Sequence, residues 1–211
     1  MAKMNGVYTS MKGKLGGGVL QTWKGLQVLR TNAIPANPKS VGQLQQRSNF
    51  SQIVEAIRPI WETSLKKYWE PFTLNQESAW NNMMSANLDA MKGASFDPLK
   101  LILTKGTLQS AAITGCNLHE IGNYINIYHD VISLVNGNPS DYAQGFMYNK
   151  KTNKWFVSEF NYPRSSIHTY IDNVTSDINE DMTVYLFFCT RDDLTGKILK
   201  VSNSISSTVP S

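Results

Sequence analysis

Apolar residues between positions 40 and 69 recur every three or four positions, the spacing of one face of a helix. Ser40 can cap the first turn, and Gln43 completes a capping-box pattern three residues later. Pro59 lacks a backbone donor and clashes with the preceding turn, so it should kink or divide the helix. The apolar positions are Val41, Leu44, Ile53, Val54, Ile57, Trp61, Leu65, Tyr68 and Trp69.

A similar spacing in TLNQESAWNNMMSANLDAM predicts a second helix that ends by Gly93. Core or helix-to-helix packing is the simplest interpretation of its apolar stripe, although methionine also suits a surface that adapts to a partner. The stripe consists of Leu74, Trp80, Met83, Met84, Asn87, Leu88 and Met91.

After Pro98 the period changes to short runs of β-branched and aromatic residues, which predict strands. Turn-forming residues separate these runs, and strands at this spacing predict a β-sandwich. FMYNKKTNKWFVSEF predicts a hairpin with residues 149–154 at its tip, and VYLFFCTRDDLTGKILKVSNS predicts another. The other runs are LKLILTKG, NYINIYHDVI and SSIHTYIDNV.

The opening stretch GKLGGGVLQTWKGLQVLR combines glycines that permit tight turns with a rough alternation of apolar and polar residues. It predicts a hairpin or an extended arm with Trp23 and Val28 on a packed face. An arm would pair with a neighbouring copy, and a hairpin would pack on its own domain; both interpretations stay open. Pro35 and Pro38 should hold the following linker extended.

These patterns predict an α+β fold in three parts. Residues 1–39 form the glycine-rich basic arm or hairpin with its linker, and residues 40–93 form a helical region of two or three helices. Residues 94–211 form an antiparallel β-sandwich domain.

Basic and acidic residues are distributed unevenly along the chain. The 211 residues are 41% hydrophobic and 17% charged, the profile of a soluble globular protein, and the formal net charge is +4. Residues 1–54 carry seven Lys and Arg and no Asp or Glu, whereas residues 94–211 carry nine basic and eleven acidic residues. The basic end could therefore attract the acidic face of another copy or a nucleic acid. No run resembles a membrane helix or a secretory signal, so we expect a cytoplasmic product without membrane contact.

The sequence does not match common catalytic or cofactor motifs. Lys14 is followed by leucine rather than Ser or Thr, so the P-loop motif fails, and the glycine order does not fit GxGxxG. None of the three histidines forms HExxH. Cys116 and Cys189 lack zinc-ligand spacing and are expected to be reduced core residues, with a disulfide between them as the open alternative. We expect no enzymatic activity, no cofactor and no metal.

The order of motifs resembles an uncharacterised family found in Bacteroidetes genomes and their phages. The N-terminal stretch followed by NPKSVGQLQQRSNF is similar to that family's G-x-x-G-G-x-V, W-K-G and P-x-(S/T)-x-x-Q-x-x-x-R-x-x-F progression. KLILTKGTL, FMYNKKTNKW and VYLFFCTRDDLTGKILKVSNS resemble its strand before a K-G-x-L turn, its Y-N-x-x hairpin and its closing hairpin. The resemblance implies helices followed by an immunoglobulin-like sandwich, and virion structural work where members occur in phages. The long DDLTGKILK tip and the two-helix region depart from the family pattern.

Two functional hypotheses follow. In the first, the protein is a non-enzymatic structural protein of a tailed-phage virion, made in the host cytoplasm. It would be an oligomeric ring or sleeve subunit of the neck or tail, whose arm contacts other copies or other virion proteins. In the second, the basic N-terminus binds nucleic acid while the sandwich recognises another surface. The candidate assembly residues are Gly16, Gly17, Gly18, Trp23, Lys24, Arg30, Gln43 and Arg47.

Overall fold

In the computed structural model, the chain divides into two compact units. The N-terminal unit is Met1–Leu44 with Leu74–Gln76, and the main unit is Gln45–Thr73 with Glu77–Ser211. The structure describes residues 2–4, 12–32, 37, 39–73, 77–88, 96–119, 123–130, 137–139, 141–158, 162–172, 174, 182–192 and 194–209.

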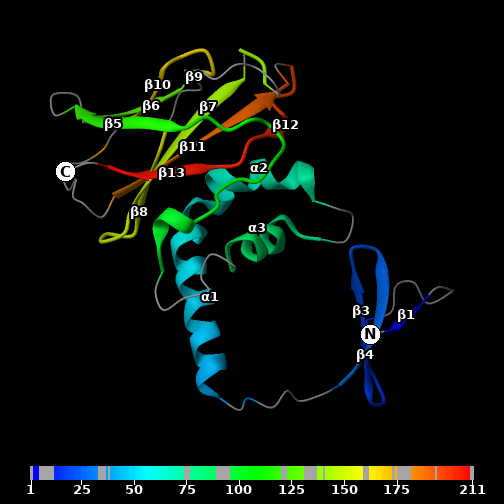
Figure 1. Ribbon diagram of the computed structural model, residues 1–211. Coiled ribbons are helices and arrows are strands. Elements are labelled where there is room, and N and C mark those ends of the chain that lie inside the picture. The colour runs from blue at the N-terminus through cyan, green and yellow to red at the C-terminus, as the bar shows by residue number, and fades with distance from the viewer. Residues whose placement is uncertain are drawn as a thin grey trace. The chain divides into compact units, whose positions relative to one another are not determined.

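The N-terminal unit contains a four-stranded antiparallel sheet in the order β1-β4-β3-β2 (Figure 1). Lys24 and Gly25 alone separate β3 from β4, and their φ values of 45° and 79° are those that a type I′ hairpin turn requires. The stretch that predicted a hairpin or an arm is therefore a hairpin. The strands are β1 (Ala2–Met4), β2 (Gly13–Leu15), β3 (Gly18–Trp23) and β4 (Leu26–Thr31).

The predicted first helix forms, and its hydrogen bonding changes close to the proline. α1 (Val41–Ile60) contains Pro59 and continues into a π-helix, η1 (Trp61–Leu65). A proline cannot donate to the preceding turn, and the shift to wider π-type bonding two residues later fits that missing donor. At the other end, the Gln43 N–H donates to Ser40 Oγ over 3.4 Å, as predicted for a Ser40 cap. Gln43 Oε1 has no hydrogen-bond partner among the described residues, so the reciprocal bond of a capping box is not formed there.

The helical segment continues with α2 (Lys66–Trp69) and the 3-10 turn η2 (Glu70–Phe72). The second predicted helix appears as α3 (Ala79–Leu88). Leu74, Met91 and Gly93 of that prediction lie outside the described residues. No helix in the described part of the chain is long and apolar enough to cross a membrane.

The main unit contains two antiparallel sheets. One has the order β10-β6-β5, and the other is built on the central pair of β7 and β11. In the larger sheet, β12 and β13 pair along one edge of β11, while β8 and β9 pair along the outer edge of β7. The strands are β5 (Ile113–His119), β6 (Tyr124–His129), β7 (Tyr142–Asn149), β8 (Lys154–Val157), β9 (Tyr162–Pro163), β10 (His168–Ile171), β11 (Met182–Arg191), β12 (Ile198–Val201) and β13 (Ile205–Thr208).

The central strands of the larger sheet, β7 and β11, are buried on both faces, which explains the unbroken apolar run of β11. Tyr185 and Phe187 pack in one core with side chains of α1, η1, α2 and α3. Val184 and Leu186 point the other way and share a second core with the three-stranded sheet. The main unit thus has three layers, helices, large sheet and small sheet, and the α+β class is confirmed (Figure 1).

Both predicted hairpins are confirmed, and both cysteines are buried and free. β7 pairs with β8 up to Asn149 and Lys154, and β11 pairs with β12. Cys116 lies in the core beneath the small sheet and Cys189 in the core beneath the helices. Because the large sheet separates the two cores, the alternative of a disulfide between these cysteines is wrong.

The run LKLILTKG is not a strand, which corrects the sequence-based expectation. Pro98–Lys100 form a 3-10 turn, η4, and residues 101–110 make only an isolated bridge between Leu108 and Ser202. Side chains of the closing segment hold this stretch instead, because Ser204 Oγ accepts from the N–H groups of both Leu103 and Thr104. Side-chain acceptors therefore replace the ladder that a strand would have used.

Candidate functional site

The register of the N-terminal sheet gathers one aromatic, three apolar and two basic residues on one face. Val19 is opposite Arg30, Gln21 is opposite Val28, and Trp23 is opposite Leu26. Directly paired residues in a sheet share a face, and Lys14, opposite Val19, extends the set onto β2. The tryptophan face therefore consists of Lys14, Val19, Gln21, Trp23, Leu26, Val28 and Arg30.

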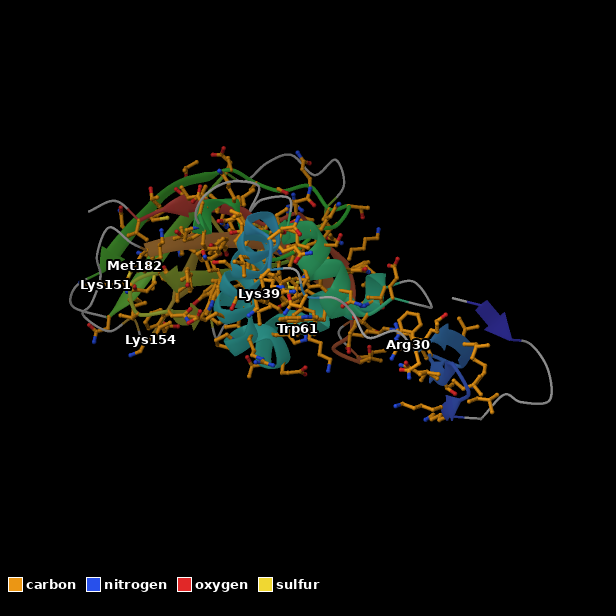
Figure 2. The ribbon with its side chains drawn as sticks, turned by 90° about the horizontal axis from the view of Figure 1, so that it is seen from below. Arg30, Lys39, Trp61, Lys151, Lys154 and Met182 are labelled. Carbon is orange, nitrogen blue, oxygen red and sulfur yellow. The ribbon has the colours of Figure 1, made fainter. Side chains whose placement is uncertain are left out.

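This face is open and positively charged. Trp23 is 41% exposed, and Lys24 Nζ lies 5.7 Å from the centroid of its ring, within cation–π range. Lys14 and Arg30 are also exposed, and Figure 2 labels Arg30 on the sheet. Residues 12–32 contain no Asp or Glu, so no carboxylate of this segment compensates the cations.

The opposite face contains the small core of the sheet. Leu20 is opposite Leu29, and both Leu20 and Gln27 are buried. Thr22 Oγ1 donates to Gln27 Oε1 over 2.8 Å, which satisfies the buried amide oxygen. Trp23 and Val28 do share a face, as predicted, but the register turns that face away from the buried Leu20.

The small core contributes little to the stability of the N-terminal sheet. Between residues 12 and 44, Leu20 and Gln27 are the only described residues that are buried. Small sheets with little buried apolar surface are marginally stable in water and gain stability from further contacts. An exposed tryptophan on the other face is the natural place for such a contact.

The candidate residues divide between the sheet and α1. Gly16 and Gly17 form the turn between β2 and β3, with φ of 56° at Gly16, and Gly18 begins β3. A Cβ at Gly18 would lie 2.9 Å from Leu29 Cδ1, so the end of the Leu29 side chain would have to move to make room for it. Trp23 and Lys24 lie together at the β3–β4 turn, whereas Arg30 is opposite Val19, four residues from Trp23 along the same face. Gln43 and Arg47 lie four residues apart on α1 and outside the sheet.

The first half of α1 carries exposed apolar residues that the helical pattern assigned to a core. Val41 is 86% exposed and Leu44 is also exposed, whereas burial begins at Ile53. Phe50, which the pattern did not include, is exposed as well. Val41 and Leu44 belong to the N-terminal unit, and the buried residues of α1, from Ile53 to Ile60, all belong to the main unit. The period of the sequence identified the apolar face correctly, but it contains no information about where the covering sheet ends.

Sequence reasoning missed Lys14 and Leu26 as members of the tryptophan face. The sequence contains a signal for both residues, because two-residue turns at Gly16-Gly17 and Lys24-Gly25 fix the register of the strands on either side. The register then decides which residues share a face. Among the residues that the structure describes, no group of three or more His, Cys, Asp or Glu could hold a metal ion.

No curated protein and no solved structure matches this chain significantly. The family of unknown function DUF6266 matches residues 10–206, which include β2 to β4 of the N-terminal sheet and nearly all of the main unit. Because the match covers most of the chain, this protein belongs to the family DUF6266.

Proposed function

We propose that this protein is a non-enzymatic structural protein that assembles with other copies or with partner proteins through its N-terminal sheet. Its proposed context is the virion of a tailed phage, as a ring or sleeve subunit of the neck or tail. The observation that carries the proposal is the tryptophan face, an exposed aromatic and apolar surface with cations at its rim and only a small core behind it.

The composition of this face supports a role in protein contact. Tryptophan and arginine are enriched among residues that dominate binding energy, and Trp23 and Arg30 share the face with Val28 and Leu26. The sheet also offers an edge at β2, whose three residues are exposed and pair only with β3 among the described strands. A neighbouring chain could add a strand at this edge.

Charge supports a partner with an acidic surface. The first 54 residues contain no acid, whereas residues 94–211 contain eleven acidic and nine basic residues. Head-to-tail contact between the basic part of one copy and an acidic patch of the next would be complementary, and such contacts close into rings. Two facing antiparallel sheets further support the proposal that the C-terminal part is immunoglobulin-like.

A second candidate function is nucleic-acid binding by the same face. Its support is the exposed Trp23 ring beside Lys24, with Lys14 and Arg30 further along the same face, since such a surface can contact phosphates and stack a base. Binding of that kind should weaken steeply as salt is raised.

Light scattering of the full chain tests the assembly proposal. We expect an oligomer whose mass falls to that of a monomer after removal of residues 1–36 and falls in part for Trp23→Ser. The matched control is Leu15→Ser, because Leu15 is 66% exposed in the same unit but pairs with Gly18 on the other face. An oligomer that survives the truncation would refute assembly through the sheet. A monomer with salt-sensitive binding of single-stranded DNA would favour the second candidate.

A further inference from the structure

Two irregular elements border one pocket of the main unit, between the helices and the large sheet. The pocket has a volume of about 260 Å³. Lys67 and Tyr68 line it from the helical side, and Tyr142, Cys189 and Arg191 line it from the sheet.

The helical wall departs from α geometry in η1. The Lys66 N–H donates to the Trp61 carbonyl, five residues back, and the residues that follow enter the pocket wall. The sheet wall is irregular as well, because the register between β11 and β12 shifts between Thr190 and Arg191, and Leu199 has no opposite residue. π-turns and β-bulges are frequent beside functional sites, and here both lie at one cavity.

Two positive charges converge on this pocket. Lys67 and Arg191 both line it, and no Asp or Glu is among the lining residues that the structure describes. The Arg191 guanidinium lies 4.8 Å from the centroid of the Tyr142 ring, and its Nε is buried with no hydrogen-bond partner among the described residues. An unpaired buried donor of this kind is costly, and a ligand oxygen would satisfy it.

Lys67 is set in the same environment. Lys67 is exposed as a residue, but burial around its ammonium group lowers the pKa of that group. The nearby positive charge of Arg191 lowers this pKa further. Cys189 does not supply a compensating negative charge at neutral pH, because burial raises the pKa of its thiol to about 11.

The floor of the pocket is held in place by hydrogen bonds. The Tyr68 hydroxyl donates to Gln144 Oε1 over 3.2 Å, and Gln144 Nε2 donates to the carbonyl and the hydroxyl of Ser158 at 2.9 and 3.0 Å. These contacts fix the amide and the phenol, so the cations face a preorganised cavity.

We propose that this pocket binds a phosphate group through Lys67 and Arg191. A phosphate monoester carries a charge near −2 at neutral pH and therefore matches two cations, whereas a carboxylate would leave one of them uncompensated. A guanidinium suits bidentate contact with phosphate oxygens, and an ammonium adds a second charge from another direction. This inference is independent of the proposed assembly function, because it uses only residues of the main unit.

Calorimetric titration of the full chain with inorganic phosphate at pH 7 tests this site. Lys67→Gln and Arg191→Gln should each weaken the affinity about tenfold or more, since each removes a charge-assisted contact. The matched controls are Lys66→Gln, whose ammonium pairs with Glu62, and Arg58→Gln in the last turn of α1; both should keep the wild-type affinity. Circular dichroism would confirm that every variant is folded.

Chemical labelling gives a second readout. Phosphate should slow acetylation of Lys67 by acetic anhydride, measured by mass spectrometry, and leave Lys66 unchanged. The affinity for glycerol 3-phosphate is then compared with the affinity for inorganic phosphate. Tighter binding of glycerol 3-phosphate would identify a phosphate ester as the ligand, and equal affinity for the two compounds would identify free phosphate. Any of three results would overturn the proposal. Acetate could bind as tightly as phosphate, both pocket variants could keep the wild-type affinity for phosphate, or phosphate could show no saturable binding.

Discussion

Asn87 joins α3 to the segment that follows η4, and its removal should destabilise the main unit strongly. The side chain is completely buried. Its Nδ2 donates to the Ile102 carbonyl over 2.9 Å and to the Met83 carbonyl over 3.0 Å, and its Oδ1 accepts from the Ile102 N–H over 2.7 Å. The amide thus takes the place of a strand partner for Ile102.

The size of the effect follows from the two backbone groups that Asn87→Ala would leave unpaired. Each buried donor or acceptor without a partner costs about 1–3 kcal/mol, so loss of both hydrogen bonds to Ile102 should cost about 2–6 kcal/mol of unfolding free energy. Domains of ordinary stability have only about 5–15 kcal/mol in total. The expected loss is therefore a large fraction of the stability of the main unit.

Urea denaturation followed by tryptophan fluorescence would measure this loss. Trp61, Trp69 and Trp155 lie in or against the core that α3 shares with the large sheet, so their emission reports on the main unit. The matched control is Asn81→Ala, because Asn81 is exposed on the same helix and should change the stability by less than about 0.5 kcal/mol. A loss below about 1 kcal/mol for Asn87→Ala, or a loss equal to that of the control, would refute the reasoning.

Three further predictions follow from other contacts. Gly106→Ala should lower the melting temperature with a loss of about 1–3 kcal/mol, because a Cβ there would lie within 2.0 Å of the Val201 carbonyl oxygen and the segment must shift. Folding raises the pKa of both Cys116 and Cys189 from 9.0 to about 11. The contribution of the two buried thiols to stability is therefore complete below pH 9 and is lost as pH rises through 11. Denaturant midpoints measured between about pH 8 and 11 would show the decline. Gly25→Ala should weaken the β3–β4 hairpin by about 1 kcal/mol, since its φ of 79° disfavours other residues, and hydrogen exchange of the hairpin amides would detect the change.

Each of these predictions has its own control. Gly42→Ala in α1 has open space and no left-handed φ, so it should be neutral or stabilising, and a loss like that of Gly106→Ala would contradict the steric argument. A Cys116→Ala, Cys189→Ala double variant should show a shallower alkaline decline than the wild type, and parallel profiles would rule out the thiols as its source. Gly17→Ala should leave hairpin exchange unchanged, because Gly17 has no left-handed φ and no neighbour within 4 Å of an added Cβ.

Local features of the sequence determined the parts of the fold that depend on neighbouring residues. Ser40 and Pro59 marked the start of α1 and the change of helix type, because a cap and a missing donor act within one turn. Lys24 and Gly25 marked the first hairpin, since a two-residue turn with positive φ is encoded at the turn itself. The cluster of Trp23 with Lys24 in the candidate site followed from the same local signal.

Tertiary structure alone decided which surfaces are covered and which distant residues meet. The period of α1 could not show that Leu44 is exposed, because coverage depends on how far the packed layers reach. The composition of LKLILTKG favoured a strand, but the hydroxyl of Ser204 took its backbone donors. The pocket of Lys67 and Arg191 likewise needed the helices to pack on the large sheet. Such contacts join residues far apart in the chain, and their free energy comes from burial and hydrogen bonding in the assembled core, which short-range sequence patterns do not encode.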